Sequence, residues 1–107
     1  MTGLVSVYVT CTSRSQATDI GRTLVQERLA ACANVLPGMV SYFVWEGVLH
    51  RDREVALLLK TRAALFPSVE TRVRGLHSHD VPCVVAWPLV GVSEPYRRWV
   101  EEQTRDA

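Results

Sequence analysis

The sequence feature that most restricts the fold of this chain is the run VALLLKT at residues 55–61. Its apolar residues follow one another without alternating with polar ones, and Lys60 carries its single charge. Such a run is typical of a strand that is covered on both faces. A chain of 107 residues has room for one domain and not for two. We therefore expect a single domain over residues 1–107, with residues 55–61 inside its sheet.

A helix is predicted soon after residues 3–11, which form the first expected strand. Ser13 and Gln16 form an S-x-x-Q pattern, in which each side chain can satisfy a free backbone donor at a helix N-terminus. The residues that follow place apolar side chains on one helical face, namely Ala17, Ile20, Gly21, Leu24, Val25 and Leu29. This face is expected to cover the sheet.

The other elements follow from strand and helix patterns in the rest of the chain. Strands are expected over residues 3–11, 31–45 and 83–89, and Glu46-Gly47 supplies a turn before an extended or mobile segment over 48–53. Pro37-Gly38 predicts a bulge within the second strand. A second helix is expected from about Pro67 to Val81-Pro82, with Leu65, Val69, Val73 and Leu76 facing the sheet, and a short one from Pro95.

The resulting order is β-α-β-β-α-β followed by an extra C-terminal helix. This order predicts an α+β fold, a ferredoxin-like sandwich with one antiparallel sheet and two helices on one face. Right-handed crossovers make the first two strands parallel, on either side of the third. The fourth strand then lies on the far side of the first.

Two features predict contacts with other chains. The hairpin formed by residues 39–45 and 48–61 is longer than one small domain needs, and several aromatic rings fall where a four-stranded sheet would leave them exposed. These rings belong to Tyr42, Phe43, Trp45, Trp87 and Trp99. Large exposed apolar patches commonly mark interfaces. The alternative is that the C-terminal helix packs over the open face of the sheet.

Charge and cysteine content exclude several classes of partner. Twelve Lys and Arg against eleven Asp and Glu give a net charge of +1, whereas nucleic-acid-binding proteins commonly show a basic face. No segment has the apolar length that spans a bilayer, and the N-terminus lacks the features of a secretory signal. The three cysteines form no C-x-x-C pair. We expect a cytoplasmic protein with no nucleic-acid or membrane partner.

Four blocks, in order along the chain, resemble the CutA divalent-cation-tolerance family. They are RLAACANVLPGMVSYFVWEG at 28–47, LLLKTR at 57–62, LHSHDVP at 76–82, and Tyr96 with Trp99. The resemblance implies the ferredoxin-like fold, a homotrimer in which long hairpins extend sheets between subunits, and a role in the response to divalent metals such as copper. The chain departs from the family pattern at Ser78, His79, Asp80 and Cys83.

The predicted topology suggests a metal site. Cys11 ends the first strand at the edge of the sheet where the second helix also ends, so it should approach His77, His79, Asp80 and Cys83. Thiolate and imidazole ligands suit copper or zinc. The resemblance associates the positions of Cys11 and His77 with copper binding, and we add His79.

Each of these residues also has a structural interpretation. Cys11 can be a small buried residue of the core. His77 can cap the C-terminus of the second helix, and His79 can be an aromatic ring on the surface. His50, in the hairpin, is interpreted as incidental.

Three non-enzymatic functions are considered first, and a hydrolase is a distant fourth, because H-E-x-x-H, P-loop and G-x-S-x-G motifs are absent. The first is a homotrimer that binds Cu(II) or another divalent metal weakly. The second is a signalling module, resembling the trimeric PII proteins, that binds a small anionic ligand between subunits near Lys60 and Arg62. The third is a structural trimer that anchors a partner protein.

Overall fold

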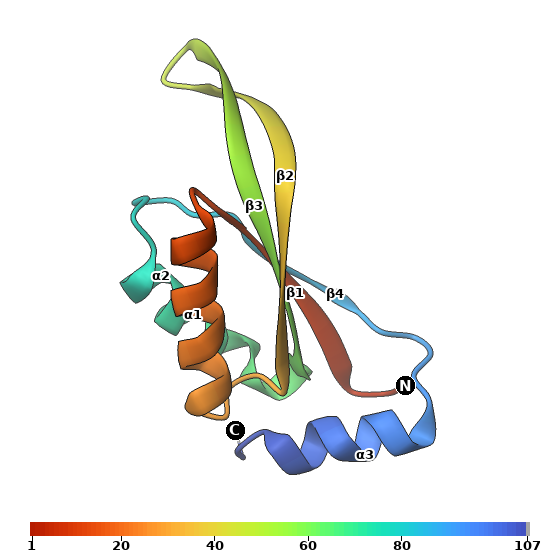
Figure 1. Cartoon of the computed structure of the whole chain (residues 1–107). Coiled ribbons are helices and arrows are strands. Elements are labelled where there is room, and N and C mark those ends of the chain that lie inside the picture. Colours follow the sequence, from red (N-terminus) through yellow and green to blue (C-terminus); the bar gives the residue numbers. More distant parts are fainter. Residues whose placement is uncertain (107) are drawn as a thin grey trace.

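The computed structural model describes residues 1–106 and contains one sheet and three α-helices (Figure 1). In chain order the elements are β1 (Leu4–Cys11), α1 (Arg14–Gln26), β2 (Cys32–Trp45), β3 (Val48–Arg62), the 3-10 turn η1 (Ala63–Leu65), α2 (Phe66–Leu76), β4 (Val84–Pro88) and α3 (Glu94–Gln103). The predicted order and the predicted α+β class are confirmed.

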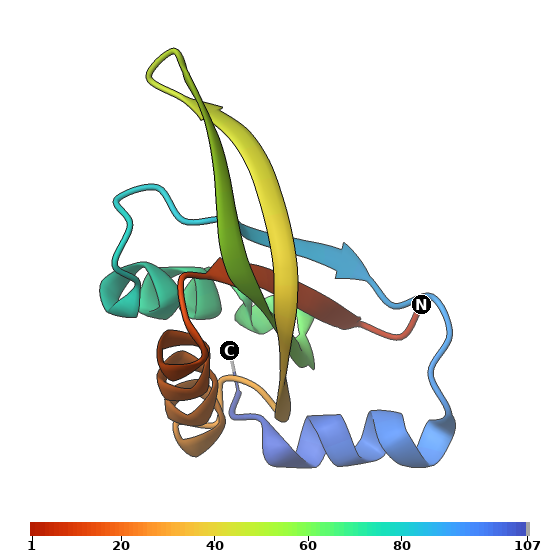
Figure 2. The same ribbon diagram turned by 45° about the horizontal axis from the view of Figure 1, so that its top comes forward.

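The sheet has the strand order β2-β3-β1-β4, and every neighbouring pair is antiparallel. β1 and β2 are therefore parallel and flank β3, as predicted (Figure 2). The register places Cys11 opposite Val55 and Leu4 opposite Arg62. The run at residues 55–61 thus pairs on both sides, with β1 and with β2.

One face of the sheet carries the main core beneath α1 and α2. Because side chains alternate along a strand, Val7 and Val9 of β1 share this face with Leu57 and Leu59 of β3, and all four are buried. The helices contribute the buried residues Ala17, Ile20, Leu24, Val69 and Val73 to the same cluster. The helices predicted to cover the sheet do so on one face.

The first helix begins where its sequence predicts, but it ends before Leu29, the last residue predicted to lie on its apolar face. The backbone N–H of Gln16 donates to Ser13 Oγ at 3.1 Å, and Gln16 Oε1 accepts from the N–H of Thr12 at 2.9 Å. The helix stops at Gln26, so Leu29 is buried from the following turn and not from the helix.

The second helix also ends before its predicted limit. It stops at Leu76, not at Val81-Pro82. The predicted inward position of Leu76 is wrong, since this side chain is 37% exposed. His77 is the C-cap, with an extended backbone that turns the chain away from the helical spiral.

β2 and β3 continue beyond the rest of the sheet as a two-stranded arm, residues 39–54. Its ladder runs from the pair Met39↔Glu54 to the pair Trp45↔Val48. β1 ends at Cys11, opposite Val55, and so supplies no third strand there. The predicted bulge lies at the base of the arm, between Leu36 and Met39. The segment 48–53 is a regular strand in this ladder.

α3 packs at the other end of the sheet, against Leu4 and Cys32 on the face opposite the main core, and leaves the rest of that face uncovered (Figures 1 and 2). Its buried Val100 forms a small second cluster with Leu4 and Ala31. Arg28 donates to the carbonyl oxygens of Glu102 and Gln103 at the C-terminal end of the helix. The alternative in which this helix covers the open face is therefore observed only at this end of the sheet, since Val85 and Trp87 remain exposed.

The close contact between α1 and the sheet yields a stability prediction. A Cβ on Gly21 would lie 2.9 Å from Ala33 Cβ and 3.1 Å from Leu57 Cδ1, closer than packed carbons normally approach. We expect Gly21→Ala to destabilise the protein by about 1–3 kcal/mol through overpacking. Gly75 has open space around it, so Gly75→Ala should be neutral or stabilise by up to about 1 kcal/mol. Urea unfolding measures both; equal stability of the two variants would contradict the packing described.

Candidate metal site

Cys11 is the last residue of β1 and points into the core. Its side chain is fully buried, and burial, with a smaller contribution from the charge of Glu54, raises the pKa of its thiol to about 11. The thiol is therefore neutral near pH 7. A metal ligand needs the thiolate, so coordination by Cys11 would require both deprotonation and access.

His77 lies beside the end of β1, as the sequence predicted, and both its ring nitrogens are engaged. Nε2 lies 2.8 Å from the carbonyl oxygen of Thr10 and donates to it, because a carbonyl only accepts. Nδ1 accepts from the backbone N–H of His79 at 3.0 Å. The buried ring therefore ties the segment after α2 to the end of β1. This arrangement supports the structural interpretation of His77.

A second contact holds the same segment, which we call the α2–β4 loop, residues 77–83. Gln16 Nε2 donates to Ser78 Oγ at 2.8 Å, while Gln16 Oε1 accepts from Thr12. The capping residue of α1 thus also fixes the loop. The loop is held at its start by a backbone carbonyl of β1 and by a side chain of α1.

His79 and Cys83 of the loop are not buried in the core as Cys11 is. The His79 ring is exposed and lies 5.1 Å from the His77 ring, centroid to centroid. Val84 pairs with Val9, so the preceding Cys83 belongs on the opposite face of the sheet from Cys11. Burial raises the pKa of Cys83 as well. The structure does not bring the two thiols together.

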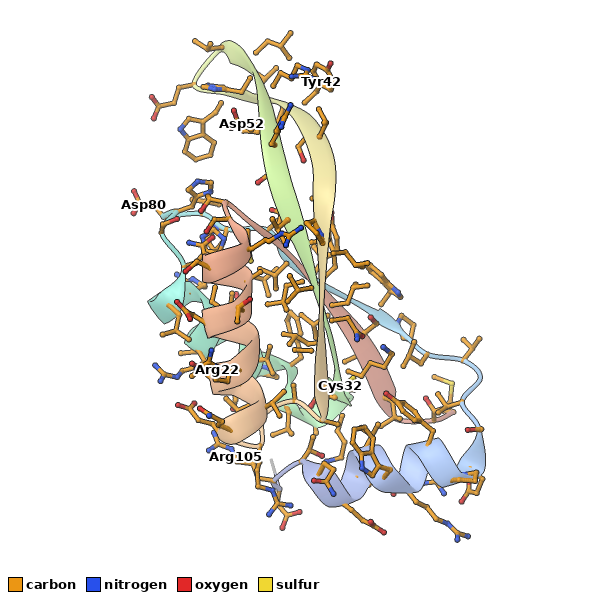
Figure 3. The ribbon with its side chains drawn as sticks, viewed as in Figure 1. Arg22, Cys32, Tyr42, Asp52, Asp80 and Arg105 are labelled. Carbon is orange, nitrogen blue, oxygen red and sulfur yellow. The ribbon has the colours of Figure 1, made fainter. Side chains whose placement is uncertain are left out.

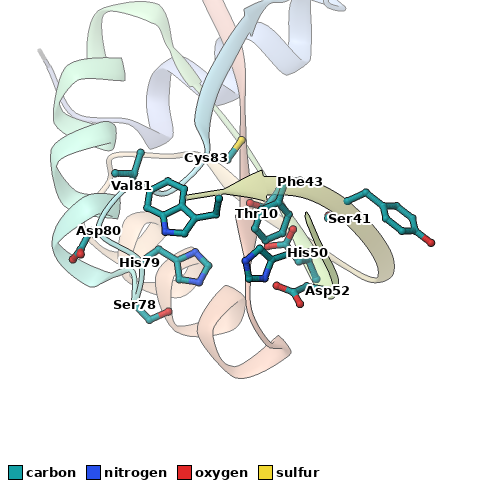
Figure 4. Close-up of a pocket in the computed structure, with 13 residues that line it drawn as sticks. Thr10, Ser41, Phe43, His50, Asp52, Ser78, His79, Asp80, Val81 and Cys83 are labelled. Carbon is teal, nitrogen blue, oxygen red and sulfur yellow. The ribbon is translucent and has the colours of Figure 1, made fainter. Parts of the chain in front are cut away.

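A cavity of about 600 Å³ lies between the arm and the α2–β4 loop (Figure 4). The arm contributes His50, Asp52 and Glu54 to its lining, and the loop contributes His79, Asp80 and Cys83. Figure 3 shows Asp52 on the arm and Asp80 on the loop at the same end of the molecule. No Lys or Arg from the described chain lines this cavity. Its donors, imidazole, carboxylate and thiol, are those that copper and zinc accept.

The side chains do not form a preassembled metal centre. Within residues 1–106, no three His, Cys, Asp or Glu side chains stand close enough to hold an ion. The ligand set Cys11, His77 and His79 accordingly remains a prediction. An ion would need side chains to converge.

The contribution of the arm to this cavity was not predicted from the sequence. His50, Asp52 and Glu54 alternate along β3 and so share one face, which was a usable signal. What could not be anticipated is that this face lines a cavity, because that depends on how the arm leaves the sheet. The interpretation of His50 as incidental overlooked this position.

The fold and this cavity place the chain in the class of small α+β sandwich proteins that carry a long two-stranded arm. Comparisons with known proteins identify the family. Residues 5–103 match the family model described as CutA1 divalent ion tolerance protein. The chain belongs to this family. No helix in residues 1–106 has the length and apolar character to cross a membrane.

Individual relatives agree with this assignment. The "Divalent-cation tolerance protein CutA" of Thermus thermophilus is 41% identical over 98 residues, covering 92% of this chain and 95% of that protein. "Protein CutA, chloroplastic" of Arabidopsis thaliana is 39% identical over 95% of this chain, which spans only 56% of that protein. The crystal structure of CutA1 from Oryza sativa superposes with a TM-score of 0.94 at 34% identity, covering 100% of both chains.

The buried thiol yields a prediction about pH. The thiol ionises near its ordinary pKa of 9.0 in an unfolded chain and near 11 in the folded protein. The contribution of Cys11 to stability is therefore fully present below pH 9 and is lost as the pH rises to 11. We expect Cys11→Ala, whatever its stability at pH 7, to lose less stability between pH 9 and 11 than the unaltered protein. Urea unfolding across this range measures the difference, and parallel curves would contradict a buried neutral thiol.

Proposed function

We propose that this chain is a homotrimeric binding protein for a divalent metal, copper by preference, and acts in the response to metal ions rather than as an enzyme. The observation that carries the proposal is the composition of the cavity beside the α2–β4 loop. It combines two imidazoles, a thiol and three carboxylates with no basic side chain from residues 1–106. Membership of a divalent ion tolerance family supports the same conclusion.

The three predicted site residues are proposed to serve this binding in different ways. Of the three, only His79 lines the cavity. Its ring forms no hydrogen bond within residues 1–106, so we assign it as a ligand. Cys11 and His77 lie behind it at the end of β1, where burial and hydrogen bonds engage them. We propose that they support the loop, and become ligands only if those contacts open.

The cavity does not suit the anionic ligand of a PII-like module, whose expected place near Lys60 and Arg62 lies outside the cavity lining. Asp52, Glu54 and Asp80 would repel an anion there. Of the basic residues considered for that role, Lys60 Nζ donates to Asn34 Oδ1 at 3.3 Å and Arg62 Nε donates to Thr104 Oγ1 at 3.0 Å, while Arg62 Nη2 is buried without a hydrogen-bond partner in residues 1–106. A cation is the better match to the charge of the site.

Exposed apolar surface supports the homotrimer. On one face of the arm, Val44 and Leu49 are paired across the strands and are 66% and 68% exposed. Val85 and Trp87 are also exposed on the open face of the sheet. Surface of this kind is characteristic of subunit contacts. The three free thiols support a reducing compartment, for which we propose the cytoplasm.

The metal proposal predicts saturable binding of Cu(II) and Zn(II) by the metal-free protein in a calorimetric titration. His79→Ala should weaken this binding about tenfold or more, since even residues that only orient a ligand contribute tenfold. Arg22→Ala, on the exposed surface of α1, serves as a control and should bind normally. Binding should weaken at acid pH because protons compete for imidazole. Absence of saturable heat from both metals, or binding of ATP in their place, would refute the proposal.

The trimer proposal predicts a mass in light scattering three times the 12.0 kDa of the chain. Charging the apolar face of the arm by the double substitution Val44→Lys and Leu49→Lys should lower that mass, because lysines would have to be buried in the contact. Thr18→Lys places the same charge on the exposed surface of α1 and should leave the mass unchanged. A 12.0 kDa species for the unaltered protein would contradict the proposal.

A further inference from the structure

The arm and the loop place imidazole rings on opposite sides of one cavity. His50 lies on β3 within the arm, and His79 lies on the α2–β4 loop. Figure 4 shows the two rings directed into the cavity from these two sides, with Asp52 beside His50 and Asp80 directed away. We propose that a divalent cation binds between the arm and the loop, with His50 and Asp52 on one side and His79 on the other. This inference rests on the proposed function and specifies its ligands.

The local structure of the arm presents His50 and Asp52 to the cavity. Two residues apart on one strand, they share a face. Their Cα partners on β2 are Phe43 and Ser41, which also line the cavity. The His50 ring stacks on the Phe43 ring, with centroids 5.2 Å apart and planes inclined by 10°. This contact orients the imidazole, and within residues 1–106 its nitrogens form no hydrogen bond, so they are available to an ion.

The charges around the cavity favour a cation. Asp52, Glu54 and Asp80 contribute carboxylates to the lining. The neighbouring arginine Arg51 points elsewhere, because its Nε donates to the hydroxyl of Tyr42, its cross-strand partner, at 3.0 Å. Because side chains alternate along β3, the acidic side chains lie on the face toward the cavity and Arg51 lies on the other face. Two imidazoles and a carboxylate are a ligand set that zinc and Cu(II) accept.

An ion in this position would draw the arm and the loop together. The cavity of about 600 Å³ is far larger than an ion, and no three of its donors are within reach of one point as they lie. The start of the loop is fixed by His77 and by Gln16. The arm has two strands, a bulge at its base and no third strand from residues 1–106 beside it, and a two-stranded ribbon without further strands is only marginally stable. Closure is therefore expected from the arm.

Substitutions on the two faces of the arm test this inference. In calorimetric titrations with zinc and with copper, His50→Ala and Asp52→Asn should each weaken binding about tenfold or more, and His79→Ala should do the same. Arg51→Ala, on the other face of the same strand, should bind as the unaltered protein does or slightly more tightly. Light scattering and circular dichroism should show that every variant keeps the mass and the fold of the unaltered protein.

The outcomes separate this inference from the function on which it rests. If His50→Ala and Asp52→Asn bind normally while His79→Ala does not, the arm is not part of the site, and this inference fails while metal binding stands. If the unaltered protein binds neither metal, both fail. Weakening by His50→Ala, Asp52→Asn and His79→Ala, with normal binding by Arg51→Ala, supports an ion held between the arm and the loop.

Discussion

The buried contact between the two central strands and the two covering helices determines where everything else lies. The apolar side chains of β1 and β3 share one face, and their removal from water by α1 and α2 is the main favourable contribution to the fold. A slip of one residue would expose that whole face, so the register is fixed with Cys11 opposite Val55. This register brings the end of β1, the end of α2 and the base of the arm to one end of the molecule.

The arm uses the two faces of a ribbon for two different purposes. One face carries Val44 and Leu49, whose exposure suits a neighbouring subunit. The other carries His50 and Asp52, which line the cavity beside the loop. Because both faces belong to the same two strands, a movement of the arm toward the loop would also alter its packing against a neighbour. Metal binding and assembly are thereby physically linked in our proposal.

The sequence predicted those features that depend on neighbouring residues and on the order of elements. The capping pair Ser13 and Gln16, the bulge at Pro37-Gly38 and the strand order are all present. The sequence did not predict the hydrogen bonds of His77, because its partner Thr10 is 67 residues away in the chain. The same limit applies to the cavity and to His50, since their roles depend on the path of the arm after it leaves the sheet.

In our proposal a divalent ion is held between the arm and the loop, while His77 keeps a supporting role. The chain contains three histidines, so nuclear magnetic resonance of histidine-labelled protein during a zinc titration reports on each ring separately. We predict that the ring signals of His50 and His79 shift together and saturate, while the His77 signals keep the pattern of a ring bonded through both nitrogens. A large shift of His77 with His50 unchanged would contradict the account and place the ion at the end of β1.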